Sequence, residues 1–220
     1  MKKGLVITWL ILLAAGIGLF FWQSAWKYSL PTPVPSNYHD VTRGELVRLP
    51  PSALKALGIS KAAPMLAASQ PSAAPLGQKP LFLHFFNPDC PCSRFNMPQF
   101  KALIQQYGQQ VSFAIVVMSP KKYTAEQLQE KFELPYPIPV LTDSAVAAAC
   151  GVYSTPQAVL LDAGGQLFYR GNYNKSRYCT DEATSFASQA LNGLLHHDYS
   201  LTFSPMALKA YGCQLPSCQQ

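Results

Sequence analysis

The sequence predicts an α/β domain, in which helices flank a mixed sheet, preceded by one N-terminal transmembrane helix. Three observations predict it. Gly4–Trp22 is an apolar segment without a charge. From Leu81 onwards, apolar runs of strand length alternate with helical patterns. Two cysteines, Cys90 and Cys92, lie where the first strand gives way to the first helix. We therefore divide the chain into an anchor (1–26), a spacer (27–79), a domain (80–198) and a cysteine-containing tail (199–220).

The N-terminal segment has the length of a membrane span. Gly4–Trp22 is close to the ~20 residues that cross a bilayer as a helix. The lysine pair before it favours a cytoplasmic N-terminus, and Trp22 and Trp26 suit the far interface. We expect a single pass through the inner (cytoplasmic) membrane, with the domain in the periplasm or extracytoplasmic space. A cleaved signal peptide is the alternative, although the site at 23–25 is poor. With an anchor or a signal peptide alike, the domain is exported to a compartment in which disulfides can form.

The next segment reads as a spacer. Prolines recur between Pro31 and Pro80 with alanine and serine between them, which is typical of an extended linker. One short helix is predicted from Ala53 to Leu57, with Ser52 as its cap and Gly58 as its stop. We expect no chemistry in this spacer.

The domain shows the order β-α-β-α-α-β-β-α, which predicts a mixed sheet with helices on both faces. Thr124 and Gln127 have the spacing of a capping box. Asp162–Gly165 is the turn of a predicted hairpin. The predicted elements, in order, are a strand from Leu81, a helix through Phe100 and Tyr107, a strand Val111–Val117, a helix to Phe132, a helix Asp143–Ala149, strands Gln157–Leu161 and Leu167–Tyr169, and a helix from Thr180 to Leu195.

The cysteine pair Cys90 and Cys92 points to thiol redox chemistry. At the start of a helix, unpaired N–H groups and the helix dipole favour the thiolate, which is the reactive form. A disulfide across one intervening residue departs far from relaxed geometry, and strained bridges are easily reduced. Two inert thiols, a static bridge and Cu(I) binding are the alternatives.

The cysteine motif after the first strand, together with Thr155-Pro156 before the hairpin, resembles the thioredoxin fold over roughly Leu81–Leu195. With its anchor, the chain resembles the TlpA/ResA-like thiol oxidoreductases. The resemblance implies that Cys90 is the attacking cysteine. It implies that Pro156 is a cis-proline, which packs beside the active sulfurs and receives the substrate chain.

The chain also departs from the family pattern. Ser93 stands at the place of the second cysteine of Cys-x-x-Cys, and Asp89 replaces the usual tryptophan. Asp89 is expected to raise the pKa of Cys90, and Arg94 to lower it. His84 stands where thioredoxin keeps a buried proton-accepting aspartate. It is either a core histidine or the proton acceptor for the departing thiol.

Four further cysteines complete the set. Cys150 and Cys179 are interpreted as a structural disulfide, a relay pair or two free thiols. Cys213 and Cys218 are expected to pair and staple the tail, with a second redox shuttle or a metal site as the alternative. Sequence alone does not choose among the pairings.

These observations predict a membrane-tethered thiol–disulfide oxidoreductase that acts on protein thiols or disulfides, with an unidentified redox partner and no cofactor. Cys90 attacks, Cys92 resolves the mixed disulfide, and Thr155 and Pro156 hold the partner's backbone. The alternative is a Sco-like copper metallochaperone that uses Cys90 and Cys92. The net charge of +6 is scattered without a basic stripe, which argues against a nucleic-acid partner.

Overall fold

The computed structural model describes residues 2–26, 30–59, 79–175 and 184–214, in two compact units, 1–31 and 32–220. The first unit contains helix α1 (Lys2–Phe21), followed by a turn of π-helix, η1 (Trp22–Trp26). By length and composition α1 qualifies to cross a membrane, because ~20 helical residues span ~30 Å. Its large apolar side chains are exposed in the structure.

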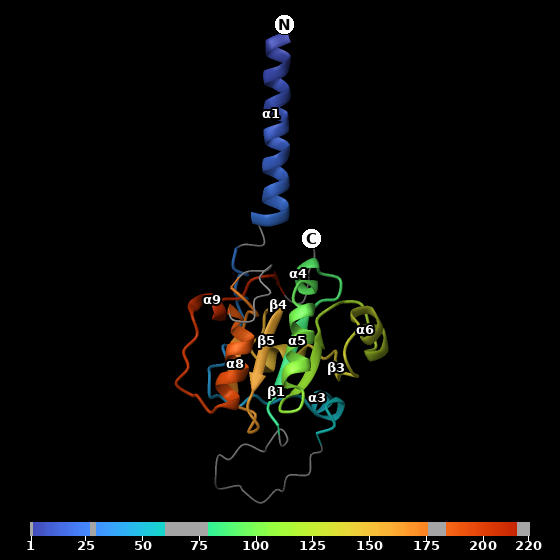
Figure 1. The fold of residues 1–220 in the computed structure, drawn as a ribbon, viewed down its shortest axis with the longest axis vertical. Helices are drawn as coiled ribbons and strands as arrows, with labels where there is room; N and C mark the ends of the chain where they lie inside the picture. Colours follow the sequence, from blue (N-terminus) through green and yellow to red (C-terminus); the bar gives the residue numbers. More distant parts are fainter. Residues whose placement is uncertain (1, 27–29, 60–78, 176–183, 215–220) are drawn as a thin grey trace, which may run out of the picture. The chain divides into compact units, whose positions relative to one another are not determined.

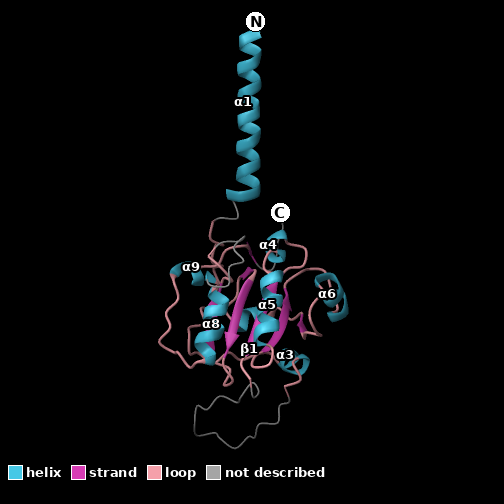
Figure 2. Cartoon of the chain, viewed as in Figure 1, coloured by secondary structure: helices cyan, strands magenta, loops and turns pink. Residues whose placement is uncertain are grey.

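The second unit is built on a five-stranded mixed sheet with strand order β3-β2-β1-β5-β6. Figure 2 shows this sheet in magenta with helices around it. The central strand β1 is parallel to β2, which is parallel to β3, and β1 is antiparallel to β5, which pairs with β6 as the predicted hairpin. All six residues of β1 are buried, since neighbours flank it on both edges and layers cover both faces. The strands are β1 (Leu81–Phe86), β2 (Ser112–Val117), β3 (Val140–Leu141), β5 (Gln157–Leu161) and β6 (Leu167–Gly171).

Helices cover both faces of the sheet, as the sequence predicts. Alternate residues of β1 face opposite ways, so Phe82 and Phe86 join one hydrophobic cluster and Leu83 and Phe85 join another. The first cluster contains residues of α5 (Met97–Tyr107), α6 (Ala125–Phe132) and α8 (Phe186–Leu195), and the second contains residues of α3 (Pro51–Ala56) and α7 (Ala145–Ala149). Figure 1 shows α5 and α8 crossing the same face.

Three helices differ from the prediction. The short helix α3 spans Pro51–Ala56, and its N-cap is Pro50 and not the predicted Ser52. The helix expected to follow the cysteines is divided into a single turn, α4 (Pro91–Arg94), and α5, whose first turn contains Pro98. A proline is tolerated in a first turn but lacks the N–H that would continue a helix from α4. The last helix begins at Phe186 with Ser185 as its cap, and the start predicted at Thr180 lies outside the described residues.

Part of the predicted spacer belongs to the domain. Val47 N–H donates to the carbonyl of Gly165 (2.9 Å), and Leu167 N–H donates to the carbonyl of Glu45 (2.8 Å). Val41, Val47 and Leu49 are buried in the second cluster. These apolar residues cover a sheet face that would otherwise be exposed, so the domain includes residues well before 80.

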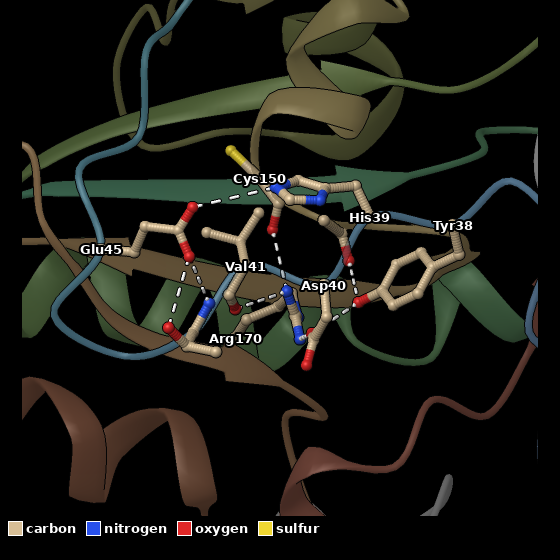
Figure 3. A network of polar contacts seen from close by, with 9 residues as sticks. Tyr38, His39, Asp40, Val41, Glu45, Cys150 and Arg170 are labelled. Atoms are coloured by element: carbon tan, nitrogen blue, oxygen red, sulfur yellow. Dashed lines mark hydrogen bonds and ion pairs between the residues drawn. The ribbon is translucent and has the colours of Figure 1, made fainter.

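Arg170 on β6 holds this early segment in place (Figure 3). Its guanidinium donates to the Asp40 carboxylate (2.7 Å), the Val41 carbonyl (3.0 Å) and the Cys150 carbonyl (3.3 Å). The Asp40 carboxylate also accepts a hydrogen bond from the Tyr38 hydroxyl (3.0 Å). The hydrogen bonds from Arg170 keep the pKa of Asp40 below its usual range. The network therefore joins residues 38–41 to the end of α7.

The last part of the chain forms elements that the sequence does not predict. Helix α9 (Pro205–Leu208) is followed by β7 (Cys213–Gln214), which pairs antiparallel with β4 (Ser154–Thr155). Helices α4 and α9 and strand β4 lie at the same end of the sheet (Figure 1). The tail therefore returns to the end of the sheet where Cys90 lies.

Candidate functional site

Two sulfur atoms from distant parts of the chain meet at this end of the sheet. Cys90 Sγ lies 2.7 Å from Cys213 Sγ, although 123 residues separate them in the sequence. Both residues are buried, with 4% of Cys90 and 6% of Cys213 exposed. The sequence predicts Cys90 as the reactive cysteine but places Cys213 in a tail bridge, so the contact between them is a new finding.

A compact loop after β1 positions Cys90. The Cys90 N–H donates to the Asn87 carbonyl (3.0 Å), and the Asp89 N–H donates to the Asn87 side-chain oxygen (2.9 Å). The Asn87 N–H in turn donates to the hydroxyl of Ser93 (3.1 Å). Asn87 and Ser93 are both buried. Cys90 is the N-cap of α4, but α4 is only one turn long, so the helix dipole acts on it less than the sequence predicts.

Strand β7 positions Cys213. In the antiparallel register Cys213 is paired with Thr155 and Gln214 with Ser154. Gly212, just before the strand, has φ +137°, a conformation that L side chains rarely adopt. A methyl group there would overlap the carbonyl oxygen of Thr155. Only glycine allows this approach of the tail to β4.

The peptide bond between Thr155 and Pro156 is cis, as the resemblance implies, and the role of Pro156 in receiving a substrate stays a prediction. Because Thr155 is the residue paired with Cys213, the sulfur pair lies beside this Thr-Pro step. The Thr155 hydroxyl is buried and has no hydrogen-bond partner among the described residues. The structure thus brings Cys90, Thr155 and Pro156 to one place, as predicted, and adds Cys213.

The carboxylate of Asp89, adjacent to Cys90, is stabilised in its charged form by neighbouring side chains. It accepts hydrogen bonds from the hydroxyls of Tyr123 (2.6 Å) and Ser119 (3.0 Å), and the Lys121 ammonium lies 3.3 Å away. The Tyr123 hydrogen bond is the main reason that the pKa of Asp89 falls below its usual value. Asp89 is therefore ionised at neutral pH, with its charge shared among these groups. Arg94, the opposing charge in the sequence argument, is exposed.

His84 is a core residue. Its ring stacks on Phe100 (4.4 Å between centroids) and Phe86 (5.0 Å), and Nδ1 lies 2.5 Å from the hydroxyl of Tyr173. Complete burial lowers the pKa of His84 to about 3. Nε2 has no hydrogen-bond partner in the described part of the chain. A ring with this pKa is neutral at physiological pH and takes up a proton poorly, which disfavours the proton-acceptor alternative.

The remaining predicted cysteines divide into two groups. Cys150 is fully buried, and burial raises the pKa of its thiol to about 12, so it lacks the properties of a relay thiol. Figure 3 shows its carbonyl, and not its sulfur, facing Arg170. Cys179, Cys218 and the side chain of Cys92 lie outside the described residues. The Cys150–Cys179 and Cys213–Cys218 bridges and the role of Cys92 therefore stay predictions.

Within the described ranges, no group of three or more His, Cys, Asp or Glu side chains comes together as a metal site. His84, the histidine nearest in sequence to the two cysteines, is engaged by Tyr173. The copper-chaperone alternative stays a hypothesis that a metal titration must test.

The sequence of residues 62–217 matches the profile of a family described as a domain of unknown function, DUF6436. The chain belongs to the DUF6436 family. This match covers more than half of the chain and includes both cysteines of the sulfur pair. No curated protein matches the sequence.

Solved structures with low sequence identity resemble this DUF6436 protein. An uncharacterized conserved protein from Geobacillus kaustophilus is 17% identical, covering 86% of this chain and 100% of its own, with a TM-score of 0.56. A hypothetical protein from Sinorhizobium meliloti is 18% identical, covering 64% and 81%, with a TM-score of 0.50. A secreted Mycobacterium tuberculosis disulfide oxidoreductase is 20% identical, covering 54% of this chain and 84% of its own, with a TM-score of 0.43. The strand order β3-β2-β1-β5-β6 and the cis bond before Pro156 give this chain a thioredoxin-like fold.

Sequence reasoning named Cys213 in this DUF6436 protein but missed its contact with Cys90. A signal for it existed: Ser93 stands at the place of the second cysteine, so a second sulfur from elsewhere is a reasonable expectation. Gly212 is the other signal, since a glycine beside a cysteine allows a close backbone approach. Neither signal identifies β4 as the place where the tail pairs.

Proposed function

We propose that this protein is a membrane-tethered, extracytoplasmic thiol–disulfide oxidoreductase that exchanges disulfides with protein thiols, with Cys90 as its nucleophile. The observation that carries the proposal is the contact of Cys90 Sγ with a second sulfur at 2.7 Å, beside Thr155 and Pro156. Its thioredoxin-like fold is consistent with this activity but does not establish it.

The arrangement suits thiol exchange because exchange proceeds by attack of a thiolate on a sulfur. An enzyme needs one sulfur that reacts with the substrate and a second sulfur close enough to release it. Cys90 and Cys213 meet the distance requirement in the structure. Cys92, two residues along the chain, is the releasing thiol that the sequence predicts, and Cys92→Ser is expected to trap covalent partners on Cys90 if it has that role.

A protein substrate would bind beside the sulfurs through its backbone. Strand β4 has main-chain groups that pair with an extended segment, because it already pairs with β7 in this way. The Thr155 hydroxyl, buried and without a partner among the described residues, is a hydrogen-bonding group at the same position. We assign Thr155 and Pro156 to holding the partner's chain.

The location is inferred from α1. This helix is long and apolar enough to cross a bilayer, and its exposed apolar side chains would be covered by lipid. With the preceding lysines on the cytoplasmic side, the domain would lie outside the cytoplasm, where disulfide exchange has substrates.

The experiment is reduction of insulin disulfides by the full-length chain in detergent, with dithiothreitol as the electron donor. The wild-type protein should accelerate insulin reduction above the dithiothreitol background, and Cys90→Ser should return the rate to that background. Cys150→Ser is the matched control, since it removes a buried thiol outside the site. Full activity in Cys90→Ser, with the control also active, would overturn the proposal.

A further inference from the structure

We propose that Cys213 is the resolving cysteine for Cys90, and that β7 is a built-in substrate strand. In this proposal β7 occupies the position on β4 that an extended, cysteine-containing peptide takes during exchange. The inference rests on the proposed thiol exchange at Cys90. It assigns Cys213 as the second sulfur of that site and β7 as the segment that competes with the substrate for β4.

The first support is the pairing itself. Strands β4 and β7 form a separate two-stranded antiparallel sheet, and Cys213 is the β7 residue opposite Thr155. A peptide that presents a cysteine to Cys90 while pairing its backbone with β4 would make the same contacts. Addition of an extended peptide to an exposed strand is a general mode of recognition, in which main-chain hydrogen bonds provide affinity.

The second support is that the tail is shaped for this position. Gly212 adopts φ +137° and approaches Thr155 so closely that a side chain would overlap its carbonyl oxygen. The hydroxyl of Thr32 lies 2.8 Å from that of Ser154 and donates to the Gly212 carbonyl (3.2 Å). Thr32 is buried between these partners and so ties the tail to β4. The docked tail is therefore a specific, multiply bonded conformation.

The third support is the anchor that precedes β7. The side-chain amide of Asn172 donates to the carbonyls of Met206 and Lys209 (2.7 Å each), and its N–H donates to the carbonyl of Ala207 (2.8 Å). Gly171 leaves room for this approach, because a methyl group there would overlap the Ala207 carbonyl oxygen. Helix α9 is thus fixed to the end of β6, independently of β7. Strand β7 can leave β4 while Cys213 stays nearby.

The burial of both cysteines requires such a movement. With only 4% and 6% of the two residues exposed, an external disulfide does not reach Cys90 while β7 is docked. Release of β7 exposes both Cys90 and the pairing edge of β4. Docked β7 therefore covers the site, and released β7 leaves the edge of β4 free to pair with a substrate.

The chemical steps balance. The Cys90 thiolate attacks one sulfur of a substrate disulfide, forming a Cys90–substrate mixed disulfide and releasing one substrate thiolate. As β7 returns, the Cys213 thiolate attacks the Cys90 sulfur, forming the Cys90–Cys213 disulfide and releasing the second substrate thiolate. The substrate disulfide gains two electrons, the two enzyme thiols lose them, and the two thiol protons pass to the substrate thiolates. The reverse sequence oxidises a substrate dithiol.

Return of β7 also explains how the product leaves. Strand β7 and the substrate strand compete for the same edge of β4, so the resolving thiol arrives with the segment that displaces the substrate. Ser93 does not supply the second sulfur, since its hydroxyl is used within the loop by the Asn87 N–H.

The test uses the full-length reduced chain in detergent and a ten-residue peptide whose one cysteine forms a mixed disulfide with thionitrobenzoate. Attack by Cys90 releases thionitrobenzoate, which is coloured, and mass spectrometry of acid-quenched samples measures the Cys90–peptide adduct. In the wild type the adduct should be transient, and a Cys90–Cys213 disulfide should replace it. In Cys213→Ser the adduct should persist at least 10-fold longer, whereas Cys218→Ser should behave as the wild type.

Gly212→Ala separates strand docking from the sulfur chemistry, because it keeps every cysteine. The added methyl group should displace β7 from β4, so thionitrobenzoate release should be faster and decay of the adduct slower than in the wild type. Gly58→Ala is the matched control, since Gly58 also has a positive φ (+69°) but no atom within 4 Å of an added methyl group. General destabilisation would change both variants alike and would not give opposite changes in the two steps.

The outcomes distinguish this inference from the proposed function. If Cys90→Ser abolishes thionitrobenzoate release but Cys213→Ser clears the adduct at the wild-type rate, Cys90 is the nucleophile and the assignment of Cys213 is wrong. Persistence of the adduct in Cys92→Ser alone would make Cys92 the resolving cysteine. If Cys90→Ser reacts as fast as the wild type, the proposed function itself fails.

Discussion

The hydroxyl of Ser93 accepts a hydrogen bond from the backbone N–H of Asn87 (3.1 Å), and both residues are buried. Ser93 therefore holds Asn87 in place, and the Asn87 carbonyl in turn accepts the Cys90 N–H, so both contacts fix the loop that carries Cys90. The position at which the thioredoxin pattern has its second cysteine is therefore structural in this chain, and among the described side chains the sulfur in contact with Cys90 comes from the tail.

Replacement of Ser93 by alanine is expected to lower the free energy of unfolding by about 1–3 kcal/mol, because it leaves a buried N–H without its acceptor. Chemical denaturation at neutral pH measures the change. Ser112→Ala is the control, since Ser112 lies exposed at the start of β2 and should change stability by less than about 0.5 kcal/mol. Equal effects of the two substitutions would contradict the role given to Ser93.

The buried His84 predicts a loss of stability in mild acid. Its pKa is about 3 in the folded protein, against about 6.5 when unfolded, so between these values the unfolded chain binds the extra proton. Stability contributed by neutral His84 is complete above pH 6.5 and is lost as pH falls towards 3. From pH 7.5 to 5.0 this amounts to about 2 kcal/mol.

His84→Asn should remove that pH dependence while leaving an acceptor for the Tyr173 hydroxyl. Denaturant unfolding at the two pH values measures it. His39→Asn is the control, because His39 is largely exposed, and it should keep the wild-type slope. A His84→Asn protein that still loses about 2 kcal/mol would show that another group titrates.

Cys150 should be unreactive in the folded protein. Its pKa of about 12 and complete burial leave almost no accessible thiolate at pH 8, so native-state alkylation with iodoacetamide should label it far more slowly than in denaturant. Cys150→Ser should lower stability by about 1–3 kcal/mol, because it buries a hydroxyl in an apolar cluster, while exchange activity is unchanged. Rapid labelling of the native thiol would reopen the relay alternative.

Membrane anchoring by α1, which is proposed from its length and composition, can be tested by fractionation. Peptides from the α1 region should be found in the alkaline-washed membrane fraction, attached to the domain. Leu12→Arg with Leu13→Arg should prevent stable insertion, since each charge at the centre of a span costs about 2.5–3.5 kcal/mol. The matched pair Leu12→Ile with Leu13→Ile should insert normally. Recovery of the wild-type domain in the soluble fraction without these residues would favour a cleaved signal.

The sequence predicts the parts of the fold that local patterns encode. The apolar run from Leu81, the capping box at Thr124 and the hairpin after Pro156 are all found in the structure. Each depends on residues close together in the chain, for which periodicity and turn chemistry are informative. The position of Cys90 at the end of β1 was predictable for the same reason.

The sequence does not predict the long-range contacts of short, irregular segments. Strand β7 has only two residues, Cys213 and Gln214, too few to show an alternating pattern. Val41 and Val47 lie between two proline-containing stretches, at 31–35 and 50–51, so composition indicates a spacer, although their apolar side chains cover a sheet face. In both cases the partner is more than 100 residues away, and only the folded chain identifies it.

The fixed position of α9 sets a limit on how far Cys213 can travel. Cys213 is the fifth residue after Leu208, the end of α9, so in a released β7 its Cα stays within about 17 Å of the Leu208 Cα. A short flexible tether of this kind gives an effective concentration in the millimolar range. In the proposed exchange, an external protein thiol would therefore compete against a local reactant that dilution does not remove.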